Sequence, residues 1–246
     1  MSYVPVNGIR MYYEVHGEGR PLVLLHGAFG NSLNWGGILP ELAKVRKVYV
    51  FEQQGHGHTE DRDAPLSYEA MVEDTAALME SLELEGADVF GFSDGGVVGF
   101  GLAIRYPRLV GRLAVYGAGT GRLSEVMPAE EYAQYMALPD DFGPDPLKKT
   151  YESIAPDPSK WPVLVRKLRE LGRDFKGFSP EDVWRIKAPT LIMMGERDAV
   201  TPEHAEELRR TIHDSRLVVF PGADLLLPID DPERVLGALV PFLEGE

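Results

Sequence analysis

The feature that most constrains this chain is a repeated alternation of short apolar runs with longer stretches of helical periodicity. Short apolar runs are typical of strands buried on both faces of a parallel sheet, and here they are PLVLLHG, KVYVFE, ADVFGF, RLAVYG, PTLIMMG and RLVVF. Helical patterns separate them: SYEAMVEDTAALMESL, GGVVGFGLAIRYP, PEHAEELRRTI and DPERVLGALVPFL. IRMYYEVH alternates instead like a half-exposed strand. The pattern predicts an α/β fold with a doubly wound, mostly parallel sheet flanked by helices and entered through an antiparallel strand.

One long segment interrupts the alternation. Residues 121–187 hold no strand-like run, are rich in Pro, Trp, Tyr and acidic residues, and contain the helical patches PAEEYAQYMAL and WPVLVRKLREL. A chain of 246 residues is long enough for one large domain with a sizeable core. We therefore expect residues 1–120 and 188–246 to form the core and residues 121–187 to form a helical cap inserted between two strands.

Composition excludes several classes of partner and chemistry. The 39 Asp and Glu against 25 Lys and Arg give a formal charge of -14, whereas nucleic acids and anionic membranes are held by clustered Lys and Arg. We expect neither as a partner. There is no cysteine, so disulfides, a thiolate nucleophile and Cys-ligated metal are excluded. No His/Asp/Glu cluster has metal-ligand spacing, and we expect no metal and no cofactor.

The expected location follows from two further absences. The first residues, MSYVPVNGIR, lack the features of an export signal. Apolar runs such as VVGFGLAI are far too short to span a bilayer. These observations predict a cytoplasmic protein.

The motif GFSDGG, Gly91 to Gly96, is the first candidate for catalytic chemistry. It lies where the run ADVFGF meets a helical pattern, which is the context of a G-x-S-x-G nucleophile elbow. Ser93 would occupy a strained turn, and Gly91 and Gly95 would keep neighbouring side chains out of the way. The alternative is a glycine-rich turn with an incidental serine. The strand and helix on either side favour the nucleophile.

Three further motifs extend the interpretation: LLHGAFGNS from Leu24, QQGHGHT from Gln53, and LIMMGERDAVTP from Leu191. With the GFSDGG motif, they resemble the α/β-hydrolase fold family, especially its small esterase, haloperoxidase and valacyclovirase-like serine hydrolases. The resemblance covers nearly the whole chain and is poorest in the helical insertion.

The resemblance implies an oxyanion hole formed by the backbone N–H groups of Ala28 and Asp94. Fixed backbone donors suit this role because they meet a developing negative charge without reorganising. The Asp94 side chain is expected to be a pocket-edge or capping group without a catalytic part, since a carboxylate would oppose an oxyanion. The same resemblance gives His26 a structural role in supporting the loop.

Asp198 is the candidate triad acid by the same resemblance. It follows the apolar run LIMMG and precedes Pro202, which opens a helical pattern. Its role would be to fix a histidine tautomer and stabilise the imidazolium. The alternative is a helix-capping aspartate.

The expected triad histidine is missing. In resembling proteins, the loop after the last strand has a sequence much like PGADHLLP. This chain has PGADLLLP, with Leu225 at the histidine position. We expect none of the other histidines to reach both Ser93 and Asp198, although His204, on a surface helix, comes nearest to doing so; the others considered are His16, His56, His58 and His213. Removing a triad member costs roughly 10⁴ to 10⁶ in turnover.

Three functions remain open. The first is a serine hydrolase of the carboxylesterase type whose turnover is impaired at Leu225, as an inactivated or redesigned variant. The second is a non-catalytic protein that binds a small apolar ligand on the same fold. The third, a dinucleotide-binding enzyme, is suggested by YGAGTGR, but Arg122 stands where the last glycine of G-x-G-x-x-G belongs.

Aromatic residues suggest the kind of ligand. Phe29 and Trp35 lie near the expected oxyanion loop and are the predicted pocket residues. Those of the insertion more often pack a cap onto its body than bind a ligand: Tyr132, Tyr135, Trp161 and Trp184. Together they favour a small apolar acyl or aryl ester over a sugar or peptide. We expect a monomer or small homo-oligomer.

Overall fold

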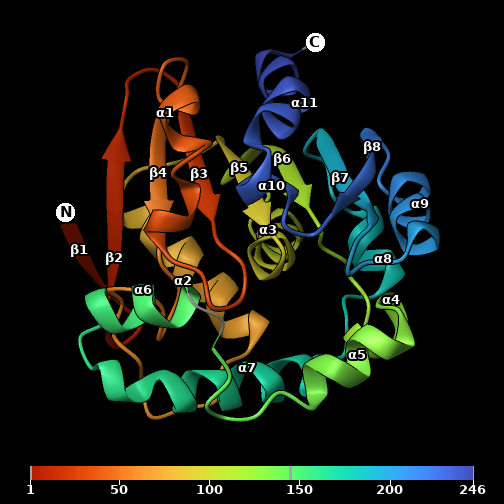
Figure 1. The fold of residues 1–246 in the computed structure, drawn as a ribbon. Helices are drawn as coiled ribbons and strands as arrows, with labels where there is room; N and C mark the ends of the chain where they lie inside the picture. Colours follow the sequence, from red (N-terminus) through yellow and green to blue (C-terminus); the bar gives the residue numbers. More distant parts are fainter. Residues whose placement is uncertain (1, 144–145, 246) are drawn as a thin grey trace.

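A single sheet of eight strands organises the chain, as seen in a computed structural model that describes residues 2–143 and 146–245 (Figure 1). Its strand order is β1-β2-β4-β3-β5-β6-β7-β8. β1 and β2 run antiparallel to their neighbours, and the other strands are parallel. The predicted fold class is therefore confirmed. The strands are β1 Ser2–Val6, β2 Ile9–His16, β3 Pro21–Leu25, β4 Lys47–Phe51, β5 Ala87–Phe92, β6 Val110–Tyr116, β7 Thr190–Arg197 and β8 Ser215–Asp224.

Helices cover both faces of the sheet, because residues of the parallel strands are apolar on both sides. In β3, for example, Val23 and Leu25 pack into one apolar core, and Leu22 and Leu24 pack into the other. The first core is closed by α2 (Tyr68–Ser81), α3 (Asp94–Arg105) and α9 (Pro202–Thr211), and the second by η1 (Ser32–Trp35), α1 (Leu39–Leu42) and α11 (Pro232–Glu244).

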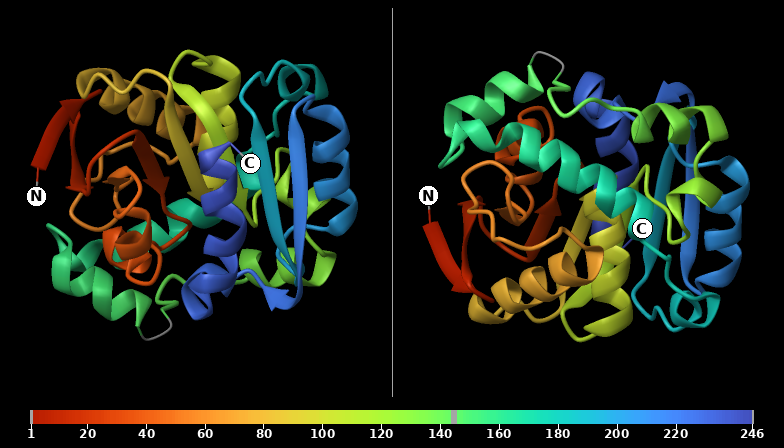
Figure 2. Two further views of the ribbon diagram at one scale, coloured as in Figure 1. Left: turned by 90° about the horizontal axis from the view of Figure 1, so that it is seen from above. Right: turned by 90° about the horizontal axis from the view of Figure 1, so that it is seen from below.

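The segment between β6 and β7 is helical, and no strand lies in the part of residues 121–187 that the structure describes. Its elements are α4 Leu123–Val126, α5 Ala129–Met136, α6 Leu147–Ile154, η2 Pro158–Lys160, α7 Trp161–Asp174 and α8 Pro180–Trp184. Seen from below in Figure 2, α7 runs across the ends of the strands. Its buried residues recur with helical spacing, so one face of α7 packs on the body.

An ion pair ties α7 to the loop after β4. Lys167 Nζ lies 2.8 and 2.9 Å from the two carboxylate oxygens of Asp61 and also donates to the Arg62 carbonyl at 2.8 Å. The Lys167 side chain is only 13% exposed. This three-way contact fixes the middle of α7 over the body.

Two elements differ from the sequence-based expectation. β1 adds an edge strand before Ile9, and its Pro5 is tolerated because it lies at the edge of the sheet. β8 continues past Gly222 to Asp224, where the sequence predicts a loop, and is followed by the short helix α10 (Leu227–Asp230). The cause is a register shift at the end of β7, which lets Asp224 pair with Arg197.

Candidate active site

Ser93 occupies a sharp turn between β5 and α3. Its backbone angles, φ 51° and ψ -118°, are unusual for a residue with a side chain. Two hydrogen bonds hold the turn: the Ser93 N–H donates to the Tyr116 carbonyl at 2.8 Å, and the Ser93 carbonyl accepts from the Gly96 N–H at 2.8 Å. This is the strained strand-to-helix geometry that the motif predicts.

The glycines of the motif allow α3 to begin so close to the sheet. A β-carbon on Gly91 would lie 2.3 Å from the Gly95 carbonyl oxygen, and one on Gly95 would lie 2.0 Å from the Leu25 carbonyl oxygen. Both distances are far inside van der Waals contact. The two glycines therefore hold Ser93 at the end of the sheet by bringing three backbone segments together.

The loop after β3 passes directly beside Ser93. A β-carbon on Gly27 would lie 3.0 Å from the Ser93 β-carbon. Among the described residues, no hydrogen bond uses the backbone N–H of Ala28 or that of Asp94. Both amides belong to segments that line the cavity at Ser93, and both retain a free donor for a ligand.

His26 is neutral and structurally bound. Its Nδ1–H donates to the Gly27 carbonyl at 2.8 Å, and its Nε2 accepts from the Gln53 N–H at 3.1 Å. Burial, assisted by the neighbouring His56 ring, lowers the pKa of His26 to about 3. With both ring nitrogens engaged by backbone groups, His26 has the loop-supporting geometry that the resemblance implies.

Asp198 follows β7 and is buried, with 4% exposure. Its carboxylate accepts hydrogen bonds from the Gly195 N–H at 2.9 Å and the Val200 N–H at 3.4 Å. Burial outweighs these bonds and raises the pKa of Asp198 to about 6. The N-cap residue of α9 is Thr201. The Asp198 carboxylate makes no hydrogen bond to the first turn of that helix in the described structure. The geometry thus does not favour the helix-capping alternative.

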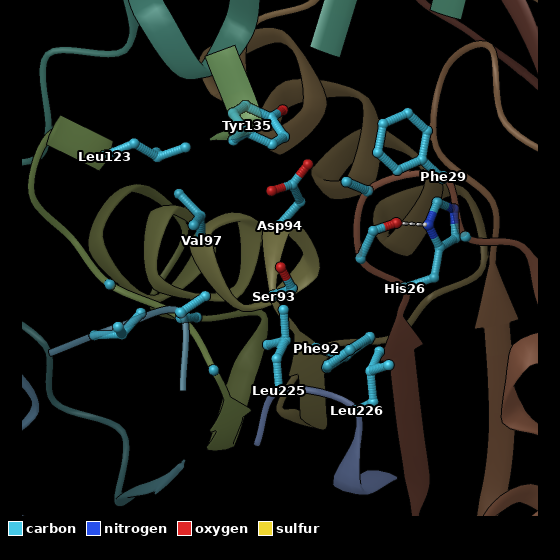
Figure 3. A pocket seen from close by; sticks show the side chains of 18 of the residues that line it. His26, Phe29, Phe92, Ser93, Asp94, Val97, Leu123, Tyr135, Leu225 and Leu226 are labelled. Atoms are coloured by element: carbon cyan, nitrogen blue, oxygen red, sulfur yellow. Dashed lines mark hydrogen bonds between the residues drawn. The ribbon is translucent and has the colours of Figure 1, made fainter. Parts of the chain in front are cut away.

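Leu225 lies beside Asp198 because the residues before them, Asp224 and Arg197, are paired across β8 and β7. A β-carbon on Gly117 would lie 2.3 Å from Leu225 Cδ1 and 3.0 Å from Asp198 Oδ1. Leu225 also lines the cavity at Ser93, and Figure 3 shows its side chain directed toward that serine. The Leu225 side chain therefore lies beside the acid and in the wall of the cavity at Ser93.

The other histidines lie elsewhere. Apart from His26, no described histidine lines the cavity at Ser93. His204 is not the solvated side chain expected of a surface helix, because its ring is mostly buried and Nε2 accepts the Thr120 N–H at 3.0 Å. His56 is buried and donates to the Gln54 carbonyl at 2.9 Å. None of these contacts gives Ser93 a base.

A cavity of about 320 Å³ opens at Ser93. Both predicted pocket residues, Phe29 and Trp35, line it. Of the cap aromatics considered, Tyr135 also lines the cavity, whereas Trp161 is buried against Phe29 with ring centres 5.6 Å apart. Trp184 is 70% exposed and so does not pack the cap as expected. Most of the lining is apolar, including Phe92, Val97, Leu123, Val126, Met127, Leu138, Phe142, Leu147, Leu226 and Ile229.

Asp94 is the functional candidate that sequence reasoning undervalued. Its side chain makes no helix-capping bond and points into the cavity (Figure 3). The carboxyl is 9% exposed and accepts a hydrogen bond from the Tyr68 hydroxyl at 2.8 Å. Burial raises the pKa of Asp94 to about 6, although the Tyr68 bond opposes the rise. An acid directly after the candidate nucleophile was the only signal, since Tyr68 comes from a different helix.

Two kinds of feature are absent from the described residues. No group of three or more His, Cys, Asp or Glu side chains is arranged to hold a metal ion there. No helix in the same ranges is both long and apolar enough to cross a membrane.

Comparisons with known proteins extend these observations. Residues 22–238 match the profile of the family described as "Alpha/beta hydrolase family". Serine hydrolase BPHL of Homo sapiens is 28% identical over 231 residues, covering 89% of this chain and 77% of that protein. The 2-hydroxy-6-oxo-2,4-heptadienoate hydrolase of Pseudomonas putida is 28% identical over 265 residues, covering 99% and 96%. A solved serine hydrolase involved in carbazole degradation, the CarC enzyme, is 27% identical, with a TM-score of 0.80 and coverage of 100% and 98%.

Proposed function

Because the chain belongs to the alpha/beta hydrolase family, we propose that it is a serine hydrolase scaffold of the carboxylesterase type with impaired turnover. In this proposal, Ser93 is the nucleophile and Asp198 is the triad acid. The N–H groups of Ala28 and Asp94 form the oxyanion hole. Relatives named as serine hydrolases support the role of Ser93.

The single observation that carries the impairment is the position of Leu225. Leu225 Cδ1 and Asp198 Oδ1 lie 2.3 and 3.0 Å from the position that a β-carbon on Gly117 would take. The Leu225 side chain also lines the cavity at Ser93. A triad histidine has to bridge these two groups, taking the serine proton with one nitrogen and donating to the acid with the other. Leucine does neither, so Ser93 remains a neutral alcohol.

The expected activity is correspondingly low. Loss of a triad member costs roughly 10⁴ to 10⁶ in turnover, while an oxyanion hole and binding pocket retain about 10³ over water. A very reactive ester or phosphylating reagent would still modify Ser93. Deacylation would be slow because no base activates water, so the adduct would accumulate.

The shape and lining of the cavity support a small apolar acyl or aryl ester as the ligand. Its walls are mainly aliphatic and aromatic, and its volume is about 320 Å³. The net charge of -14 gives no support to a nucleic acid or an anionic membrane as a partner.

The decisive experiment is Leu225→His. An imidazole at this position would reach the Ser93 hydroxyl and the Asp198 carboxylate together. We expect hydrolysis of short-chain or aryl esters to rise at least about 10²-fold, the lower end of general-base contributions. The pH profile should rise through a near-neutral pKa, as expected for histidine. Buried polarity should lower the free energy of unfolding by only about 1 to 2 kcal/mol.

Two variants make the result specific. Leu225→Asn introduces polarity of similar size but no base, and should give no gain. Adding Asp198→Asn to Leu225→His should remove most of the gain, because the tautomer is no longer held. If folded Leu225→His hydrolyses no ester faster than Leu225→Asn does, the triad proposal is wrong.

The same cavity also supports an alternative function, a non-catalytic protein that binds a small apolar ligand. It is favoured by an apolar cavity in which Leu225, and no base, lies beside Ser93 and Asp198 among the described residues. Failure of Leu225→His, together with saturable binding of an aryl ester that stays intact, would favour this alternative.

A further inference from the structure

The Asp94 carboxylate is a buried acid for which the hydrolase proposal has no use. Tyr68, from α2, donates to Oδ1 at 2.8 Å. The other oxygen, Oδ2, is buried and has no hydrogen-bond partner among the described residues. A buried polar atom without a partner costs free energy unless a ligand or water satisfies it. In Figure 3 the carboxylate projects into the cavity between Ser93 and Tyr135.

The surroundings make this carboxylate a stronger base than an exposed aspartate. Burial raises the pKa of Asp94 to about 6, and no cation offsets this effect among the described residues. The other titratable groups that line the cavity are neutral near pH 7: the pKa of His26 is lowered to about 3, and the pKa values of Tyr68 and Tyr135 are raised well above their usual range. A general base is most effective when its pKa lies close to the working pH.

We propose that Asp94 is a general base that takes a proton from a small apolar carbon acid bound in this cavity. This activity lies beyond the proposed ester hydrolysis and requires no nucleophilic attack by Ser93. Tyr68 is a positioning residue, because its hydroxyl engages Oδ1 and leaves Oδ2 as the proton acceptor.

The free amides of Ala28 and Asp94 complete the arrangement. Removing a proton next to a carbonyl, or from a ring carbon whose bond electrons expel an oxygen, puts negative charge on an oxygen, and fixed N–H donors stabilise such a charge. The carboxylate would oppose that charge only while it is ionised. In the proposed step it becomes neutral as the oxygen anion forms, so the two charges do not coexist.

A nitro-substituted benzisoxazole is a direct probe of this chemistry. The Asp94 carboxylate takes the ring C–H proton, the electrons of that bond form a nitrile, and the N–O bond breaks to give a coloured cyanonitrophenolate. Asp94 then loses its proton to water. No water is added, no acyl group is transferred, and no other reactant is needed.

The first measurement compares the wild-type chain with Asp94→Asn. We expect the wild-type chain to open the ring at least about 10²-fold faster than the variant, with a rate that rises with pH through a midpoint near the pKa of Asp94. Equal rates in the wild-type chain and folded Asp94→Asn would overturn the proposal.

Tyr68→Phe provides a test that does not depend on how well Asp94→Asn folds. The Tyr68 hydrogen bond lowers the pKa of Asp94, so its removal should raise the midpoint of the pH–rate profile. Asp198 has a similar pKa but no contact with Tyr68 among the described hydrogen bonds. An unshifted midpoint would assign the titration to another group and contradict the proposal.

Ser93→Ala separates this activity from ester hydrolysis. The variant lacks the nucleophile but retains the carboxylate, so its ring opening should still fall at least about 10²-fold when Asp94→Asn is added. Equal rates in folded Ser93→Ala and folded Ser93→Ala/Asp94→Asn would overturn the role of Asp94 as the base. The gain from Leu225→His is measured on esters, so either proposal can fail while the other stands.

Discussion

At the scale of single residues, the candidate site consists of side chains held in unfavourable states by their neighbours. Ser93 has a backbone conformation that side chains rarely adopt, and Asp198 and Asp94 are acids that burial makes harder to ionise. Such features cost stability and cluster at functional sites. Their cost is measurable one residue at a time.

Ser93→Gly should stabilise the fold. Glycine adopts the φ of 51° and ψ of -118° without a β-carbon to strain the turn, and we expect the free energy of unfolding to rise by about 1 kcal/mol. Ser93→Ala removes the same hydroxyl but keeps the β-carbon, and it should show no such gain. Denaturant titration of both variants measures the difference. Equal stabilities would mean that the turn is not strained by the side chain.

Asp198→Asn should change how stability depends on pH. The pKa of Asp198 is raised from 3.8 to about 6 in the folded chain. Its neutral form therefore stabilises the fold fully below pH 3.8, and that contribution is lost as pH rises through about 6. Relative to Asp198→Asn, the wild-type chain should lose about 2 kcal/mol between pH 4 and pH 7. Thermal unfolding of both chains across this range tests the sign, and a parallel pH dependence would refute it.

Sequence alone located some of these residues and missed the state of others. Ser93 was predictable because the glycines around it leave a local signature. Leu225 stood out because the loop resembled a pattern that normally contains histidine. The unpaired oxygen of Asp94 was not predictable, because it depends on Tyr68 reaching the cavity from α2, and the burial of His204 depends on the backbone of Thr120.

At the scale of elements, register decides which residues meet. The apolar runs and helical periodicities were enough to predict the central strands and the principal helices. They did not reveal that β8 continues to Asp224, because the Gly222 and Pro221 before it suggest a turn. The extension arises from a shift in pairing between two strands that are distant in sequence. It sets the position of the residue after Asp224.

Lys167→Met should loosen α7. The lysine joins that helix to Asp61 and the Arg62 carbonyl, and its loss leaves a partly buried carboxylate with one partner fewer. We expect the free energy of unfolding to fall by about 1 to 2 kcal/mol, with faster amide hydrogen exchange in α7. Lys160→Met, at an exposed position before the same helix, is the control. Unchanged exchange in Lys167→Met would show that apolar packing alone holds α7.

At the scale of the whole molecule, the fold was predictable and the cavity was not. The order of strands and helices follows from local patterns that repeat along the chain. The cavity lies between α4, α5 and the loops at the strand ends. Its shape therefore depends on how these two cap helices, whose sequences show little helical periodicity, pack on the core. Among the cap aromatics, Trp161 packs in the core as the sequence predicts, whereas Tyr135 lines the cavity and Trp184 is exposed.

The leucine at position 225, beside Gly117, also affects how this gene could evolve. Some leucine codons become histidine codons through a single base change, and the neighbouring acid, serine and glycine turns are already in place. In the triad proposed above, a population carrying this gene would therefore be one mutational step from completing it whenever the leucine codon is of that kind. Growth on an ester as the sole carbon source would select for that step, and revertants at this codon would be its record.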